Sequence, residues 1–133
     1  MVIDTSALLA IFLAEPERQS FLERIRNDGS RLLSAPNALE TAIVLEARRG
    51  EVAGREMDLF IHRLGIELVP VDAAQVEVAR AGWRRYGKGR HPASLNFGDC
   101  FAYALAKTSG EPLLAKGNDF PKKDVRCLDI LAE

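Results

Sequence analysis

Residues 1–8 of the chain read MVIDTSAL, and this stretch joins a strand pattern to a helix pattern with no loop between them. The apolar Val-Ile pair is a short strand candidate, and Thr5 or Ser6 can cap the helix that follows. Asp4 lies at the junction of the two elements. Strands that alternate with helices in this way build α/β folds around a parallel sheet.

The same alternation of short apolar runs and longer helical segments continues along the chain. Further strands are expected at residues 31–34, 66–71, 113–115 and 125–128. Further helices are expected at residues 16–28, 36–49, 52–64, 73–86 and 97–109. The apolar residues expected to face the core from these helices include Leu39, Ile43, Leu59, Val76 and Trp83. The pattern predicts a single domain over residues 1–133, a three-layer α/β/α fold with a central, mainly parallel sheet of four to five strands.

The composition excludes several classes of protein. With 47% hydrophobic residues and 18 basic against 19 acidic side chains, the chain has a net charge of -1 and is not expected to be disordered. The balanced charge provides no global basic field, so contact with nucleic acid has to come from a local patch. No signal-peptide pattern and no apolar stretch of the roughly 20 residues of a membrane span is present. We therefore expect a soluble, cytoplasmic protein without a membrane partner.

Four acidic residues lie where a sheet of this kind opens a crevice, which is beyond the carboxyl ends of its strands. Asp4 follows the first strand, and Asp119 lies in the loop after residues 113–115. Glu40 and Asp99 stand in the first turns of two helices. Each of these residues taken alone is most simply a capping or surface charge. However, the neighbours of Asp4, Glu40 and Asp99 are apolar, and buried carboxylates are costly unless they are paired or bind a cation.

Carboxylates that converge on one crevice repel one another, and a hard divalent cation removes that conflict. A site made of oxygen ligands alone is typical of Mg²⁺ or Mn²⁺. Such ions polarise a phosphodiester, lower the pKa of a bound water and stabilise the leaving oxygen. The four acidic positions therefore indicate a metal-assisted hydrolysis as the candidate chemistry.

Four motifs follow one another along the chain: VIDTSAL at 2–8, LE at 39–40, FGDCFAYALA at 97–106 and KGNDF at 116–120. In this order and spacing they resemble the PIN-domain ribonucleases, and more closely the VapC toxins of VapBC toxin–antitoxin pairs. Each motif alone is modest, whereas the four together cover essentially the whole chain. The resemblance implies a Mg²⁺- or Mn²⁺-dependent endoribonuclease acting on tRNA, ribosomal RNA or messenger RNA. It also implies inhibition by a cognate VapB antitoxin, and a homodimer that joins the antitoxin in a larger complex.

By motif position, the resemblance implies an acidic cluster of Asp4, Glu40, Asp99 and Asp119. Asp4 and Asp99 would be the most direct metal ligands, while Glu40 and Asp119 would act directly or through water. The side chains implied to support the cluster are those of Thr5, Ser6 and Asn118. An acidic pocket of this kind would attract a basic or aromatic segment of the antitoxin.

A local basic patch in the segment after residue 79 suits RNA phosphates. The candidates for RNA contact are Arg84, Arg85, Lys88 and Arg90. A solvated helix face and loop is an equally weighted interpretation of the same residues. Residues 82–89 also match GxxxxGK, the start of a phosphate-binding loop, but Gly89 replaces the required Ser or Thr and the segment follows a helix.

Other chemistries fit the sequence less well. A Ser-His-Asp hydrolase lacks its GxSxG motif, and Ser6 opposes the Asp-x-Asp of a phosphoaspartate transferase. Cys100 and Cys127 are expected to be buried free thiols, a disulfide between them being the alternative. Asp124 is left out of the acidic cluster, because Lys122-Lys123 precede it where relatives often carry Thr or Ser. The rival function is a catalytically silent RNA- or antitoxin-binding module, against which the four intact acidic positions argue.

Overall fold

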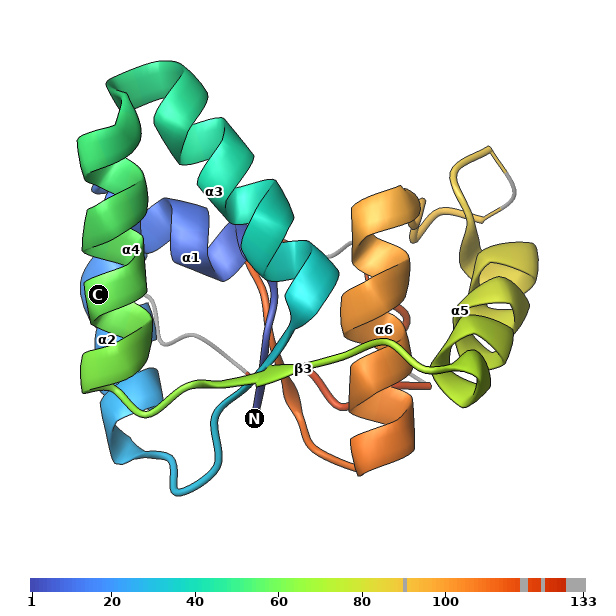
Figure 1. Cartoon of the computed structure of the whole chain (residues 1–133). Helices are drawn as coiled ribbons and strands as arrows, with labels where there is room; N and C mark the ends of the chain where they lie inside the picture. The colour runs from blue at the N-terminus through green and yellow to red at the C-terminus, as the bar shows by residue number, and fades with distance from the viewer. Residues whose placement is uncertain (90, 118–119, 123, 129–133) are drawn as a thin grey trace.

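The computed structural model describes residues 1–89, 91–117, 120–122 and 124–128, with a parallel sheet at the centre of the molecule (Figure 1). The strands are β1 (Val2–Ile3), β2 (Leu32–Ser34), β3 (Glu67–Val69) and β4 (Leu113–Leu114). They run in the order β3-β2-β1-β4. Val2 pairs with both Leu32 and Leu113, so the carboxyl end of β1 is flanked by the ends of β2 and β4.

Helices cover both faces of this sheet, and their bounds are α1 Thr5–Phe12, α2 Arg18–Asn27, α3 Ala35–Arg49, α4 Glu51–Arg63, α5 Ala73–Tyr86 and α6 Phe97–Ser109. In Figure 1, α1 to α4 lie to one side of the strands and α5 and α6 to the other. The expected α/β/α architecture with a parallel sheet is therefore confirmed. The strand expected at 125–128 is represented by a single parallel bridge between Cys127 and Leu113. No helix among the described residues combines the length and apolar character that crossing a membrane requires.

Alternate residues of the strands point into two separate cores, as the period of two along a strand requires. Ile3, Leu33 and Leu114 pack with α1 and α2 on one face. Val2 and Leu113 pack with α6 on the other face. Strands β1 and β4 are thus buried on both faces, which explains why they read as apolar runs, whereas Glu67 and Leu68 of the edge strand β3 are exposed.

The inner face of α3 differs from the expected one. Leu39 and Ile43 are 62% and 58% exposed, whereas Asn37, Thr41 and Leu45 are buried. Two polar side chains therefore occupy the inner stripe of the helix. The other expected core residues that are exposed are Leu59, Val76 and Trp83. The periodicity placed these helices correctly, but the assumption that every apolar stripe faces the core was wrong.

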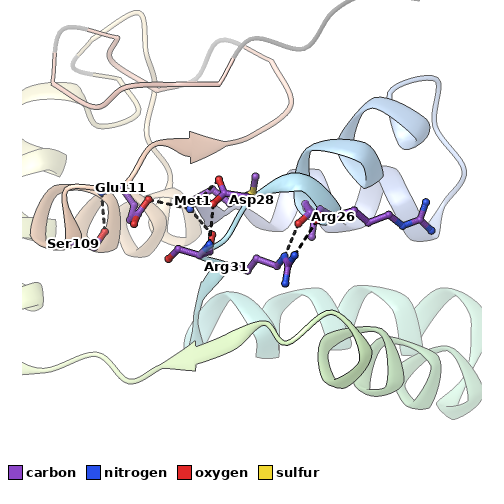
Figure 2. A network of polar contacts seen from close by, with 8 residues as sticks. Met1, Arg26, Asp28, Arg31, Ser109 and Glu111 are labelled. Atoms are coloured by element: carbon purple, nitrogen blue, oxygen red, sulfur yellow. Dashed lines mark hydrogen bonds and ion pairs between the residues drawn. The ribbon is translucent and has the colours of Figure 1, made fainter.

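Polar contacts tie the sheet together at the edge opposite the carboxyl ends of its strands (Figure 2). The buried α-ammonium group of Met1 donates to the Ser30 carbonyl at 2.6 Å and lies 3.1 Å from Glu111 Oε2 and 3.5 Å from Asp28 Oδ2. Asp28 and Ser30 precede β2, and Glu111 precedes β4. These charged groups therefore hold the amino-terminal ends of three neighbouring strands, β2, β1 and β4, together.

Candidate active site

Asp4 lies between β1 and α1 and caps α1. Its Oδ2 accepts hydrogen bonds from the Ser6 N–H at 3.0 Å and from the Ser6 hydroxyl at 2.6 Å. The expectation that Thr5 or Ser6 caps this helix was therefore wrong, because Asp4 has the extended backbone of a capping residue and accepts the N–H of the first turn. The Asp4 side chain is buried, with the residue only 3% exposed.

Burial raises the pKa of Asp4 above its ordinary value, and the nearby Glu40 carboxylate raises it further. The hydrogen bonds from Ser6 act in the opposite direction, because they stabilise the ionised form. Asp4 and Glu40 are therefore coupled carboxylates in a setting that disfavours two negative charges. This is the condition that a bound cation relieves.

Glu40 lies near the start of α3 and accepts hydrogen bonds from α1 and from α3 itself. Thr5 Oγ1 donates to Glu40 Oε1 at 2.6 Å, and Asn37 Nδ2 approaches the same oxygen at 3.4 Å. The Asn37 amide also donates to the carbonyl of Gly98, at the start of α6, at 3.0 Å. Thr5 thus supports Glu40, whereas Ser6 supports Asp4. Sequence reasoning missed Asn37, although an amide three residues before a carboxylate on a helix lies within reach of it.

Asp99 lies in the first turn of α6 and takes part in a capping box with Asn96. Asp99 Oδ2 accepts from the Asn96 N–H at 3.0 Å, and Asn96 Oδ1 accepts from the Asp99 N–H at 2.9 Å. Burial and the neighbouring Asp99 raise the pKa of the Cys100 thiol, which disfavours a reactive thiolate. Cys100 is thus a packing residue. Neither Cys100 nor Cys127 forms a disulfide, as expected, but only Cys100 is buried, whereas Cys127 is partly exposed.

The segment after β4 reaches the same edge of the sheet. The Lys116 N–H donates to Ser6 Oγ at 2.9 Å, so Ser6 bridges this segment and the Asp4 carboxylate. Asn118 and Asp119, which are expected to contribute here, lie outside the described residues.

Asp124 belongs to a separate network on α6. The Tyr103 hydroxyl and the Lys107 ammonium group both donate to its carboxylate, the latter at 3.0 Å. These contacts attach the segment after β4 to α6 and are consistent with leaving Asp124 out of the acidic cluster.

The basic residues expected to contact RNA lie at the end of α5 and just beyond it. Arg84 and Lys88 are exposed. The guanidinium group of Arg85 lies 5.2 Å from the centre of the Tyr86 ring. Arg90 lies outside the described residues. The described part of this basic patch is therefore open to solvent.

The donor chemistry of the site fits a hard divalent cation, because Asp4 and Glu40 offer carboxylate oxygens whose repulsion such an ion offsets. Within the described residues, however, no three His, Cys, Asp or Glu side chains gather closely enough to hold a metal ion. The structure brings Glu40 to Asp4, while the Asp99 carboxylate is engaged in its capping box. The fourth expected member, Asp119, lies outside the described part of the chain.

Comparison with known proteins agrees with this geometry, since the PIN domain family matches residues 1–126. The chain belongs to the PIN-domain family. Among PIN-domain proteins it is similar to VapC ribonucleases. It is 55% identical over 125 residues to the VapC ribonuclease Mb0640 of Mycobacterium bovis, covering 94% of this chain and 95% of that protein. It is 56% identical over 125 residues to the ribonuclease VapC of Mycolicibacterium smegmatis, covering 94% and 97% of the two chains.

Solved structures of PIN-domain proteins share the arrangement of the sheet and helices. VapC20 of Mycobacterium tuberculosis, described as a sarcin-ricin loop cleaving toxin, aligns with a TM-score of 0.77 and 18% identity over 96% of this chain and 97% of that one. VapBC2 of Rickettsia felis, solved with a DNA fragment from its promoter, aligns with a TM-score of 0.70 and 13% identity, covering 87% and 86% of the two chains. At these identities the likeness establishes the PIN fold.

Proposed function

We propose that this PIN-domain protein is the toxin of a VapBC pair, an endoribonuclease that hydrolyses phosphodiester bonds in RNA with Mg²⁺ or Mn²⁺. The observation that carries the proposal is the buried Asp4 carboxylate with the partly buried Glu40 carboxylate beside it, at the carboxyl end of β1. The identity of 55% and 56% to proteins named VapC ribonucleases supports the reaction class. The proposed substrate class is cellular RNA, whether tRNA, ribosomal RNA or messenger RNA.

The residues proposed to hold or assist the ion are Asp4, Asp99, Glu40 and Asp119. When bound, the ion would polarise the phosphodiester, lower the pKa of a water and stabilise the leaving oxygen. Ser6 favours the ionised form of Asp4 by donating two hydrogen bonds to its Oδ2. Thr5 holds one oxygen of Glu40 in place. These contacts limit the movement of both carboxylates before the substrate arrives, which lowers the reorganisation required during the reaction.

The proposed partners are inferred from the charge of two surfaces, the basic patch and the acidic site. The exposed basic patch is proposed to bind RNA phosphates through Arg84, Arg85, Lys88 and Arg90. A cognate VapB antitoxin would inhibit the enzyme by covering the acidic site with a basic or aromatic segment. Mapping the antitoxin residues whose substitution relieves inhibition tests this mode of binding.

Cleavage of total cellular RNA by the purified protein tests the proposed activity. The reaction is run with Mg²⁺, with Mn²⁺ and with EDTA, and the wild type is compared with Asp4→Asn and Asp99→Asn. We expect discrete fragments that require metal and that decrease by at least about 100-fold in either variant, since even indirect ligand contacts contribute 10- to 100-fold. Mapping the fragment ends then identifies the target RNA.

A matched control for these variants is Asp58→Asn, which removes an exposed carboxylate from α4 and should leave cleavage unchanged. Cleavage that persists in EDTA and in Asp99→Asn would contradict the metal mechanism. If folded, antitoxin-free protein cleaves no RNA with either metal, the silent binding module becomes the better explanation.

We also propose a homodimer that forms through an apolar face of α3, α5 and α6. Its exposed residues are Leu39, Ile43, Val76, Trp83 and Phe97. Phe97 is 81% exposed, and its ring packs edge-on against Phe101 with 4.8 Å between ring centres. Hollows of about 450 Å³ and 320 Å³ flank this aromatic pair on the α5 and α3 sides. A two-fold interface brings the same face of two copies together, so the aromatic ridge of one copy would meet the hollows of the other.

A further inference from the structure

The Glu40 carboxylate is enclosed by two residues to which no role in the reaction has been assigned so far. We propose that Asn37 of α3 and Gly98 of α6 are positioning residues that hold Glu40 in place at the proposed metal site. The inference rests on the proposed function for the role of Glu40 itself. It depends on three contacts: the Asn37 amide with Glu40, the same amide with the Gly98 carbonyl, and the closeness of Gly98 to the carboxylate.

Asn37 is fully buried, and its amide is oriented by its neighbours. Nδ2 faces Glu40 Oε1 at 3.4 Å and the Gly98 carbonyl at 3.0 Å. Because both neighbours are acceptors, the amino group has to face them, and Asn37 Oδ1 is left without a hydrogen-bond partner in the described structure. An unpaired buried acceptor costs about 1–3 kcal/mol. The hydrogen bonds that fix the Asn37 side chain are therefore those of its amino group, to Glu40 and to the Gly98 carbonyl.

Gly98 allows the backbone of α6 to approach the Glu40 carboxylate. A Cβ built on Gly98 would lie 2.8 Å from both Cδ and Oε1 of Glu40, which is closer than a carbon atom can approach without displacing them. Gly98 does not adopt a positive φ, so no turn requires a glycine here. Glycine in a helix costs roughly 0.5–1 kcal/mol relative to alanine. The close approach to Glu40 is the feature of the structure that accounts for this residue.

The two residues act from different elements and are themselves connected. The hydrogen bond from Asn37 to the Gly98 carbonyl joins α3 to α6, so the amide, the glycine and the carboxylate form one unit. Thr5 completes the enclosure from α1. Substitution of either residue should therefore move the Glu40 carboxylate. Loss of the Asn37 amide removes a hydrogen bond, whereas a Cβ at position 98 displaces the carboxylate directly.

Asn37→Ala and Gly98→Ala test the proposal, each with a control of the same kind. Thr41→Ala is the control for Asn37, because Thr41 is also buried in α3 and also loses a hydrogen bond, from its hydroxyl to the Asn37 carbonyl at 2.8 Å. Gly54→Ala is the control for Gly98, because a Cβ on Gly54 in α4 would lie 2.8 Å from Cδ of Glu46, a glutamate that has no part in the proposed site.

Two measurements are made on all five proteins. Titration with Mn²⁺ alone, followed by electron paramagnetic resonance, gives the metal affinity without RNA. Cleavage of a short fluorescent RNA that contains the site mapped for the wild type gives kcat and KM. For Asn37→Ala and Gly98→Ala we expect Mn²⁺ affinity and kcat to fall by about 10- to 100-fold, with KM for RNA unchanged. Thr41→Ala and Gly54→Ala should behave like the wild type, and urea unfolding should show that Gly98→Ala is folded.

The proposal is overturned if Asn37→Ala and Gly98→Ala match their controls in Mn²⁺ affinity and kcat, or if only one of the pair differs from its control. A wild type that binds Mn²⁺ but cleaves no RNA contradicts the ribonuclease function, and the Mn²⁺ titrations then decide the positioning roles separately. A wild type that binds no Mn²⁺ overturns both the proposed metal-dependent function and the positioning roles of Asn37 and Gly98.

Discussion

Asp4 is buried beside another carboxylate, so its charge is expected to destabilise the folded protein when no cation is bound. Its pKa is raised by burial and then by Glu40, against the opposing hydrogen bonds from Ser6. The folded state therefore binds the Asp4 proton more tightly than the unfolded state does. Stability consequently falls as the pH rises from near 4 through the folded-state pKa, and the loss persists at neutral pH.

Asp4→Asn should therefore be more stable than the wild type at pH 7–8 in EDTA, by about 1 kcal/mol. Asparagine keeps the acceptor for Ser6 and is an equally good helix cap, while it removes the charge. Urea unfolding between pH 4 and pH 8 measures the difference, which should shrink toward pH 4 as the wild-type side chain takes up its proton. Asp58→Asn, at an exposed position of α4, should show no such trend. A variant that is less stable than the wild type at pH 8 would show that burial of this carboxylate is not unfavourable.

At the scale of residues, the sequence predicted that two carboxylates would lie close together only where the order of the strands in the sheet determines it. Asp4 follows the central strand and Glu40 follows the neighbouring one, so parallel pairing brings them together. The roles proposed for Asn37 and Gly98 had no such signal. The role proposed for a buried amide and a helical glycine depends on the packing of α3 on α6. That packing involves contacts between residues 61 positions apart, which local sequence patterns do not predict.

At the scale of elements, the strands and helices follow closely from local patterns, while their buried faces do not. The expected helix at 73–86 coincides with α5, and Asn96 and Gly110 bound α6 as capping rules predict. On α3, by contrast, Leu39 and Ile43 are exposed and the polar Asn37 and Thr41 are buried. Periodicity measures how apolar each face is, and it cannot distinguish a face that packs on the sheet from one that meets another chain.

One arginine side chain, that of Arg31, donates hydrogen bonds to the carboxyl ends of both α2 and α4. Arg31 donates to the carbonyls of Ile25 at 2.5 Å, Arg26 at 3.0 Å and Leu64 at 2.7 Å. Figure 2 shows Arg31 close to Arg26, beside the contacts of the Met1 ammonium group. A guanidinium group suits this position because the carboxyl ends of helices carry unpaired carbonyls and partial negative charge.

Arg31→Ala should lower the free energy of unfolding by about 2 kcal/mol, because three carbonyls lose a charged donor. The free energy of unfolding of Arg31→Lys should lie between those of the alanine variant and the wild type. An ammonium group keeps the charge, but it cannot reach the same three carbonyls as the planar guanidinium group does. Urea unfolding at neutral pH gives both values. Arg49→Ala is the matched control, because Arg49 contacts a single exposed carbonyl, that of Phe12, and its loss should change stability by less than about 0.5 kcal/mol. Equal effects of Arg31→Ala and Arg49→Ala would refute the bridging role.

At the scale of the whole molecule, the exposed apolar face of α3, α5 and α6 has a consequence for assembly. Apolar residues on three adjacent helices form a continuous surface of the kind that monomeric proteins rarely expose. Glu40 borders the hollow on the α3 side, so a second copy bound there would lie next to the acidic site. Dimer formation would then shape the entrance proposed for RNA, and weakening the dimer should impair cleavage of long RNA more than it impairs metal binding.

Charge placed on this face should separate the two copies. We expect the wild type to sediment as a dimer, and Phe97→Glu or Val76→Glu to raise the dimer dissociation constant by at least about 30-fold, the effect of losing one central apolar contact worth 2 kcal/mol. Sedimentation velocity over a range of protein concentrations measures the change. Val52→Glu is the control, since Val52 is 57% exposed on α4, a helix that contributes no residue to this face. Val76 is the more informative position, because it lies on α5 and its substitution leaves the first turn of α6 and Asp99 intact. A wild type that stays monomeric, or a Val76→Glu variant that dimerises as well as Val52→Glu, would show that this face is not a dimer interface.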